Sequence, residues 1–262
     1  MAHAWSWYVT NHSLSADARA GKLTFLARDD GEASAADQVK ALSTDDLLSL
    51  MTWAPALQTW TYASSTTVYA AGNVTAIYAK GHKVKLTQSA ATKYFYITDV
   101  SAYDSGNNRT TLTLFAGSNY TVANATISSP YYSAAAVVPG FPDGFAYAAT
   151  LTGFSSNPSG AIYRFSLRGN RCMVYICMPN TGTSNSVLFY VSAPVAAKTI
   201  TNMTWYGKLG MSKDNNTNLT DEGLILVNSA ASTFLLYTSR GGGAWTASSG
   251  KSANGFIEYE WF

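Results

Sequence analysis

Charged residues are scarce in this 262-residue chain. Lysine and arginine number 17 and aspartate and glutamate 15, only 12% of the residues together, and the net charge is +2. Soluble cytosolic proteins carry about a quarter charged residues, so hydroxyl and amide side chains must cover much of this surface. The basic residues are scattered singly and form no cluster that would neutralise neighbouring phosphates. We therefore expect no binding to nucleic acid.

Long apolar runs are also missing. No segment approaches the roughly 20 consecutive apolar residues of a membrane-spanning helix. The first residues, MAHAWSWYVTN, lack the basic region and the apolar region of a signal peptide. We expect neither membrane insertion nor export by the ordinary secretory route.

Histidine and cysteine are too few and too dispersed for the common metal sites. His3, His12 and His82 have no cysteine or carboxylate partner at a ligand spacing. Cys172 and Cys177 lie five residues apart in a strand-like run, on opposite faces, so we expect two reduced, packed thiols. Neither a nucleophile elbow nor a glycine-rich phosphate loop occurs. The sequence predicts no metal, no cofactor and no catalytic residue.

A pair of carboxylates leaves one enzymatic alternative open. Glu258 and Glu260 in the last predicted strand would share a face, about 7 Å apart at strand spacing. Two close carboxyl groups can act as acid and base in the cleavage of a polysaccharide. The solvated face of a strand explains the same spacing, and we favour it. Depolymerase activity stays as the less favoured alternative.

Strand periodicity is what the chain does contain. Over residues 60–132, and again beyond residue 145, short runs alternate between apolar and polar residues and end at Gly, Asn or Ser. Residues 133–145, SAAAVVPGFPDGF, interrupt this pattern with two prolines and two glycines. The sequence predicts a mainly β fold with two antiparallel modules, a barrel-like module over residues 56–135 and a jelly-roll-like sandwich over residues 136–262.

Residues 1–55 have a different character. Residues 4–10 and 22–27 are predicted strands of a short hairpin, and residues 33–51 are rich in helix formers, which predicts two short helices or one kinked helix. The apolar residues of the helical stretch could pack against other copies of the chain or cover a sheet of the same chain. On the first interpretation, this segment attaches the protein and holds a trimer together through Trp5, Trp7, Val39, Leu42, Leu47 and Leu50.

Several stretches of the two modules are typical of one protein family. They are GHKVKLTQ, KYFYITDVS and SNYTVANATISSPYYS in the middle module, and ATLTGFSSNPSG, IYRFSLRGNRCMVYI, SNSVLFYVSAPVAAK and AWTASSGKSANGFIEYEW in the last. In this pattern the chain resembles the tail-fibre, baseplate-fibre and head-fibre proteins of tailed bacteriophages. The resemblance implies a virion protein, commonly a homotrimer, whose N-terminal part docks to other virion proteins. Its distal β-modules would face the host cell and often bind carbohydrate.

Aromatic residues support that expectation. The chain has 7 tryptophans and 17 tyrosines, and sugar rings bind by stacking on such side chains. The candidates beside polar, glycine-rich loops are Trp205, Tyr206 and Trp245, together with Arg240. Core packing is the competing interpretation of each aromatic residue. We predict a non-enzymatic structural virion protein, assembled in the host cytoplasm, exposed on the particle and bearing a head that binds host-surface glycan. A purely architectural capsid or tail decoration protein is the alternative.

Overall fold

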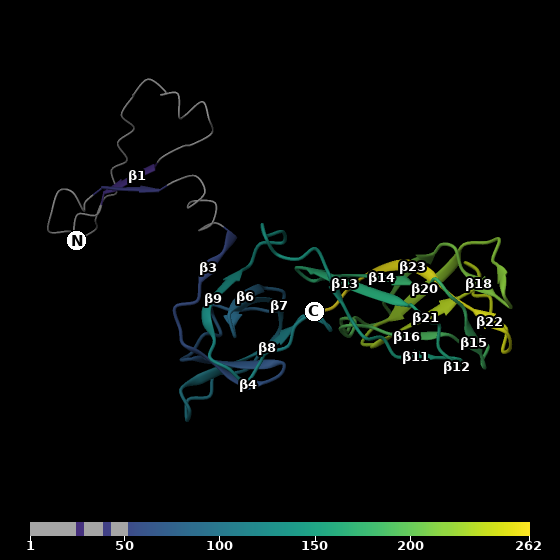
Figure 1. Cartoon of the computed structure of the whole chain (residues 1–262), viewed down its shortest axis with the longest axis horizontal. Helices are drawn as coiled ribbons and strands as arrows, with labels where there is room; N and C mark the ends of the chain where they lie inside the picture. The colour runs from purple at the N-terminus through teal and green to yellow at the C-terminus, as the bar shows by residue number, and fades with distance from the viewer. Residues whose placement is uncertain (1–24, 29–38, 43–51) are drawn as a thin grey trace, which may run out of the picture. The chain divides into compact units, whose positions relative to one another are not determined.

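The computed structural model describes residues 25–28, 39–42 and 52–262 (Figure 1). The chain divides into two compact units, Met1–Ala54 and Pro55–Phe262. Every element with described bounds is a β-strand, which confirms the prediction of a mainly β protein. Within the described ranges, no helix has the length and apolar character needed to cross a membrane.

The first unit contains a two-stranded antiparallel sheet of β1 (Phe25–Arg28) and β2 (Val39–Leu42), with Phe25 opposite Leu42. β2 lies inside the stretch that we expected to be helical, so that expectation is wrong for Val39–Leu42. Helix propensity differs by only a few tenths of a kcal/mol between such residues, and pairing with a neighbouring strand overrides it. The rest of that stretch, residues 4–10, and Trp5, Trp7, Leu47 and Leu50 lie outside the described residues.

A seven-stranded sheet comes next, in the order β3-β9-β6-β7-β8-β5-β4. Its strands are β3 (Ala54–Pro55), β4 (Trp60–Ser64), β5 (Thr67–Ala71), β6 (Lys83–Gln88), β7 (Ala91–Val100), β8 (Arg109–Phe115) and β9 (Ser128–Ser133). The pairs among β4 to β9 are antiparallel. In β8, Thr110, Leu112 and Leu114 are buried while the residues between them are half-buried, so the alternation read in the sequence places one face of the strand in the core.

The larger sheet has nine strands in the order β10-β13-β14-β23-β17-β20-β21-β16-β11. They are β10 (Phe145–Ala146), β11 (Leu151–Thr152), β13 (Ile162–Arg168), β14 (Arg171–Cys177), β16 (Tyr190–Ser192), β17 (Thr204–Leu209), β20 (Gly223–Asn228), β21 (Thr233–Tyr237) and β23 (Asn254–Glu260). Smaller sheets join β12 (Phe154–Ser156), β15 (Gly182–Ser184) and β22 (Gly250–Lys251), and β18 (Lys213–Asp214) with β19 (Thr217–Asn218).

The nine-stranded sheet curls around its own core. Phe234 of β21 and Tyr259 of β23 are separated by two strands in the sheet, yet their ring centroids are 5.6 Å apart. Figure 1 shows β14 and β23 along one side of this part of the chain and β16 and β11 along the other. One face of the sheet therefore lines the core, and the other is an outer face.

The two large sheets share an aromatic core. Phe115 of β8 stacks on Phe165 of β13 with ring centroids 5.1 Å apart, and Tyr96 of β7 meets Phe145 of β10 edge-on at 5.4 Å. Gly117 lies so close to the Ala146 carbonyl that a Cβ there would overlap it. Residues 134–144, which contain most of the predicted boundary, connect the last strand of one sheet to the first strand of the other.

Two buried lysines fix connecting segments to the sheets. Lys83 Nζ donates to the carbonyls of Ala135 and Ala136 at 2.8 and 2.9 Å. Lys251 Nζ donates to the carbonyls of Ser186 and Leu188 at 3.0 and 3.2 Å. Burial lowers the pKa of both lysines to about 8, because the charged amine loses its hydration.

Candidate binding surface

Both tryptophans that we predicted to contact a ligand are core residues. Trp205 is 6% exposed and Trp245 is 2% exposed. Trp245 Nε1 donates to the Leu236 carbonyl at 2.8 Å, and its ring meets Phe189 edge-on with centroids 5.2 Å apart. Because protein atoms cover these rings, they offer no surface on which a sugar could stack. The glycine-rich loops beside these residues correctly indicated turns in the chain. A turn nearby does not expose an indole ring, so the predicted exposure of both tryptophans was wrong.

Tyr206 and Arg240, the other two predicted contacts, lie at the surface. Tyr206 is 64% exposed on β17, where it alternates with buried Trp205. Arg240 forms an ion pair with Glu222, whose carboxylate also lies 3.9 Å from Lys208 Nζ. Lys208 is two residues beyond Tyr206 on the same face of β17. A chain of charged groups therefore connects the region of Arg240 to that of Tyr206.

Two further aromatic residues share the outer face with Tyr206. Tyr175 on β14 lies directly opposite Phe256 on β23, and their exposed fractions are 51% and 48%. Phe256 in turn lies opposite Lys208 on β17. We call Tyr175, Tyr206 and Phe256 the aromatic face. Tyr175 and Phe256 were not among the predicted contacts, although Glu258 and Glu260 alternate with buried residues on β23 and mark its outer side. The predicted aromatic contacts were chosen by their nearness to polar, glycine-rich loops, which does not tell which face of a strand a residue occupies.

Charged side chains border the aromatic face. Arg164 on β13 lies opposite Tyr175, and its guanidinium donates to the Gly144 carbonyl at 2.9 Å. The row Arg164, Tyr175, Phe256 and Lys208 crosses four neighbouring strands, which at ~4.8 Å between strands makes it roughly 14 Å long. Both ends of this row are cationic. The arrangement can stack on flat apolar rings while offering hydrogen-bond donors to the polar groups beside them.

The carboxylate pair of the last strand lies on that same outer side of β23. Glu258 is 3.8 Å from Arg171, and Glu260 lies 3.7 Å from both Arg171 and Lys198. Arg171 thus lies between the two carboxylates and offsets their mutual repulsion. That repulsion is what would raise the pKa of one carboxyl group and let the pair act as acid and base. This geometry favours the solvated strand face over the catalytic pair.

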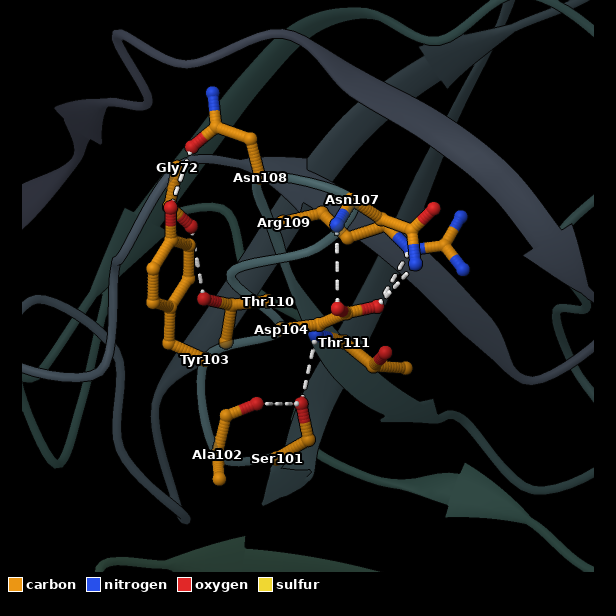
Figure 2. A network of polar contacts seen from close by, with 10 residues as sticks. All are labelled: Gly72, Ser101, Ala102, Tyr103, Asp104, Asn107, Asn108, Arg109, Thr110 and Thr111. Carbon is orange, nitrogen blue, oxygen red and sulfur yellow. Dashed lines mark hydrogen bonds and ion pairs between the residues drawn. The ribbon is translucent and has the colours of Figure 1, made fainter.

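The loop between β7 and β8 is a compact polar turn (Figure 2). Asp104 accepts hydrogen bonds from the backbone N–H of Asn107 at 3.2 Å and from its side-chain amide at 2.7 Å, and Arg109 Nε lies 3.6 Å away. These contacts, first of all the Asn107 amide, lower the pKa of Asp104. Tyr103 donates to the Asn108 side chain at 2.7 Å. The polar side chains of the loop bond to one another, which identifies it as a structural turn.

Both cysteines are free thiols on opposite faces of β14, which confirms the prediction that they form no disulfide. Cys172 is buried, and burial raises the pKa of its thiol to about 12. Cys177 is exposed, so the expectation that both thiols are packed is wrong for it. In the part of the chain that the structure describes, no group of three His, Cys, Asp or Glu side chains is arranged to hold a metal ion.

Comparison with known proteins gives no relative. No protein-family model, no curated protein and no solved structure matches the chain. The class that the fold and the surface define is therefore a mainly β protein with several antiparallel sheets and an exposed aromatic face.

Proposed function

We propose that this chain is a structural protein of a tailed-bacteriophage particle, a homotrimeric fibre subunit whose residues 136–262 form a head that binds carbohydrate on the host surface. The observation that carries the proposal is the aromatic face. Three aromatic side chains project to solvent from neighbouring strands, where burial in a core would be more favourable.

The chemistry of this face suits a glycan. The apolar faces of sugar rings stack on aromatic side chains, and their hydroxyls exchange hydrogen bonds with nearby charged groups. Lys208 and Arg164 supply donors, and Glu258, two residues beyond Phe256 on β23, supplies an acceptor. A rigid sheet holds all of these side chains, so little conformational entropy is lost when a ligand binds.

The remaining parts of the proposal rest on the sequence pattern. The sheets of residues 55–262 are compatible with a barrel-like module followed by a jelly-roll-like head. Residues 1–55 attach to other virion proteins and hold the trimer. The protein is assembled in the host cytoplasm, acts on the particle surface and catalyses no reaction.

The test is binding of the full chain to an array of bacterial surface glycans. Phe256→Ala and Tyr175→Ala should each weaken binding at least tenfold. Leu57→Ala, at a residue that is 88% exposed and outside the aromatic face, should leave binding unchanged. Light scattering should give three times the chain mass of 28.0 kDa. The adhesive part of the proposal would be wrong if the protein bound no glycan on the array, or if Phe256→Ala and Tyr175→Ala both bound as tightly as the unmodified protein.

An architectural role is the second candidate, because the exposed apolar side chains could instead pack on another virion protein. Cys177 reports on this choice, since it lies two residues beyond Tyr175 on the same face of β14. A maleimide should label it in intact particles if the face is free. Protection in particles, with labelling of the isolated protein, would favour the architectural role. Release of reducing ends from host polysaccharide, lost in Glu258→Gln, would favour the depolymerase.

A further inference from the structure

Arg164 brings a positive charge to one end of the aromatic face that no carboxylate neutralises. The residue is exposed on β13, and its guanidinium donates one hydrogen bond, to the Gly144 carbonyl. Among the described residues, every ion pair joins other side chains, and Asp143, beside Gly144, takes part in none of them. A guanidinium has five N–H donors, so most of them remain available to a ligand.

The other charged groups beside this face already form ion pairs. Four cations pair with three carboxylates, namely Arg171, Lys198, Lys208 and Arg240 with Glu222, Glu258 and Glu260. Once Arg164 is added, cations exceed carboxylates by two around the face. Such an excess attracts an anionic ligand and repels a cationic one. Because the other cations share their charge with carboxylates of the chain, Arg164 is the cation that an anion would meet unpaired.

The unpaired guanidinium lies next to a ring on which a sugar would stack. Arg164 on β13 is directly opposite Tyr175 on β14, which is in turn directly opposite Phe256 on β23. Figure 1 shows these three strands side by side. The Cβ atoms of such cross-strand neighbours are about 5 Å apart. A pyranose ring stacked on Tyr175 therefore brings a group on its edge within reach of Arg164.

This short distance decides which anion fits. The carboxylate of a hexuronate is bonded directly to its pyranose ring, so stacking of the ring also fixes the position of the charge. Arginine binds a carboxylate through two parallel N–H···O bonds. Glu258, two residues beyond Phe256 on the outer side of β23, disfavours a second negative charge at the other end of the two rings. The arrangement therefore suits one carboxylate on one sugar ring.

We propose that the aromatic face selects acidic glycans, in which a hexuronate residue stacks on Tyr175 and its carboxylate binds the guanidinium of Arg164. The next sugar of the glycan packs on Phe256. This inference rests on the proposed carbohydrate binding and adds to it the class of sugar that is bound.

The test is titration of the full chain with tetrasaccharides of galacturonate and of heparosan, each compared with its carboxyl-reduced form. An acidic tetrasaccharide should bind at least tenfold more tightly than its reduced form. Arg164→Gln should weaken acidic binding at least tenfold but reduced binding less than threefold, because glutamine keeps a hydrogen-bond donor and loses the charge. Arg168→Gln is the matched control and should change neither more than twofold, since it removes an exposed arginine from the same side of β13, about 13 Å away at strand spacing. Arg164→Lys keeps the charge without the paired geometry, should weaken acidic binding severalfold, and serves if Arg164→Gln fails to fold.

The pattern of binding separates failure of this inference from failure of the proposed function. Equal binding of the acidic and reduced forms, weakened in both cases by Phe256→Ala, would overturn the acid selectivity and leave carbohydrate binding in place. A preference for the acidic form that persists in Arg164→Gln, or that Arg168→Gln abolishes equally, would also overturn it, since the carboxylate would then be bound elsewhere. Binding of no glycan at all would overturn both.

Discussion

Tyr175 and Phe256 face each other across β14 and β23, with ring centroids 6.3 Å apart and planes inclined at 34°. The pair stands on the outer side of a sheet whose inner side is a packed core. Each ring also has a charged neighbour on its other side, Arg164 opposite Tyr175 and Lys208 opposite Phe256, and about half of its surface remains exposed.

The first prediction follows from that exposure. Phe256→Ala should lower the free energy of unfolding by less than about 2 kcal/mol, because each of its two cross-strand pairs contributes up to about 1 kcal/mol. It should nevertheless abolish most glycan binding. Urea denaturation measures the first quantity and the glycan array the second. A loss of several kcal/mol would show that the ring supports the fold and would make the binding result uninterpretable.

Phe165 should behave in the opposite way. It is 1% exposed and packs on Phe115 of the other large sheet, so Phe165→Ala should cost about 3–5 kcal/mol. Because the two sheets share this core, residues 55–262 should still unfold in one transition. Fluorescence and circular dichroism should therefore give the same urea midpoint. Two separated transitions in the native protein would contradict a shared core.

Two tyrosine hydroxyls give a matched comparison. Tyr259 donates to the Val195 carbonyl at 2.7 Å, whereas the buried Tyr147 hydroxyl has no hydrogen-bond partner among the described residues. Tyr259→Phe should lower the free energy of unfolding by about 1–2 kcal/mol, and Tyr147→Phe should be neutral or stabilising. Thermal melts of the two variants test this. A large loss in Tyr147→Phe would show that its hydroxyl is bonded.

Stability should pass through a maximum near pH 10. Burial raises the pKa of Tyr96 and Tyr163 to about 12, so their contribution is complete below pH 10 and is lost as the pH rises through 12. Lys83 and Lys251 act in the opposite sense, because burial lowers their pKa to about 8. Their buried charge destabilises the folded state below pH 8, and this destabilisation is lost between pH 8 and about 10.5, where the folded protein has released the protons that the unfolded chain still binds. Unfolding midpoints measured from pH 7 to 12 should rise slightly and then fall.

Tyr163→Phe is the control for the alkaline limb of that curve. The Tyr163 hydroxyl lacks a hydrogen-bond partner in the described part of the chain, so the variant removes its ionisation without removing a bond. The decline between pH 10 and 12 should become smaller by up to roughly 2–3 kcal/mol. An unchanged decline would exclude Tyr163 as one of its causes.

The thiols should differ in reactivity. An aromatic disulfide reagent should modify one cysteine per chain in the native protein and both after unfolding, because Cys177 is exposed and Cys172 is buried with its pKa raised to about 12. Cys177→Ser should leave the native protein unreactive. Rapid modification of both thiols under native conditions would contradict the burial of Cys172.

The sequence was sufficient to predict the strands because alternation is a local property. The run AIYRFSLRG becomes β13, with Tyr163, Phe165 and Leu167 directed to the core. It was not sufficient to assign the surface. Trp205 and Tyr206 are adjacent, and only the sheet decides which of them is buried. The sequence also could not show that Tyr175 lies beside Phe256. The two residues are separated by 80 positions, and their pairing depends on the register of β14 against β23, which is set only in the folded sheet.

The close passage of the Gly117 backbone beside the Ala146 carbonyl limits how this protein can be divided. The two large sheets follow one another along the chain, but they are not independent. Cutting the chain between them would expose Tyr96 and Phe115 on one fragment and Phe145 and Phe165 on the other. A fragment that contains only the nine-stranded sheet would therefore expose an apolar surface that is buried in the whole protein. Changes to the outer surface should therefore be made at the outer side chains of the sheet, or by transfer of residues 55–262 as a whole.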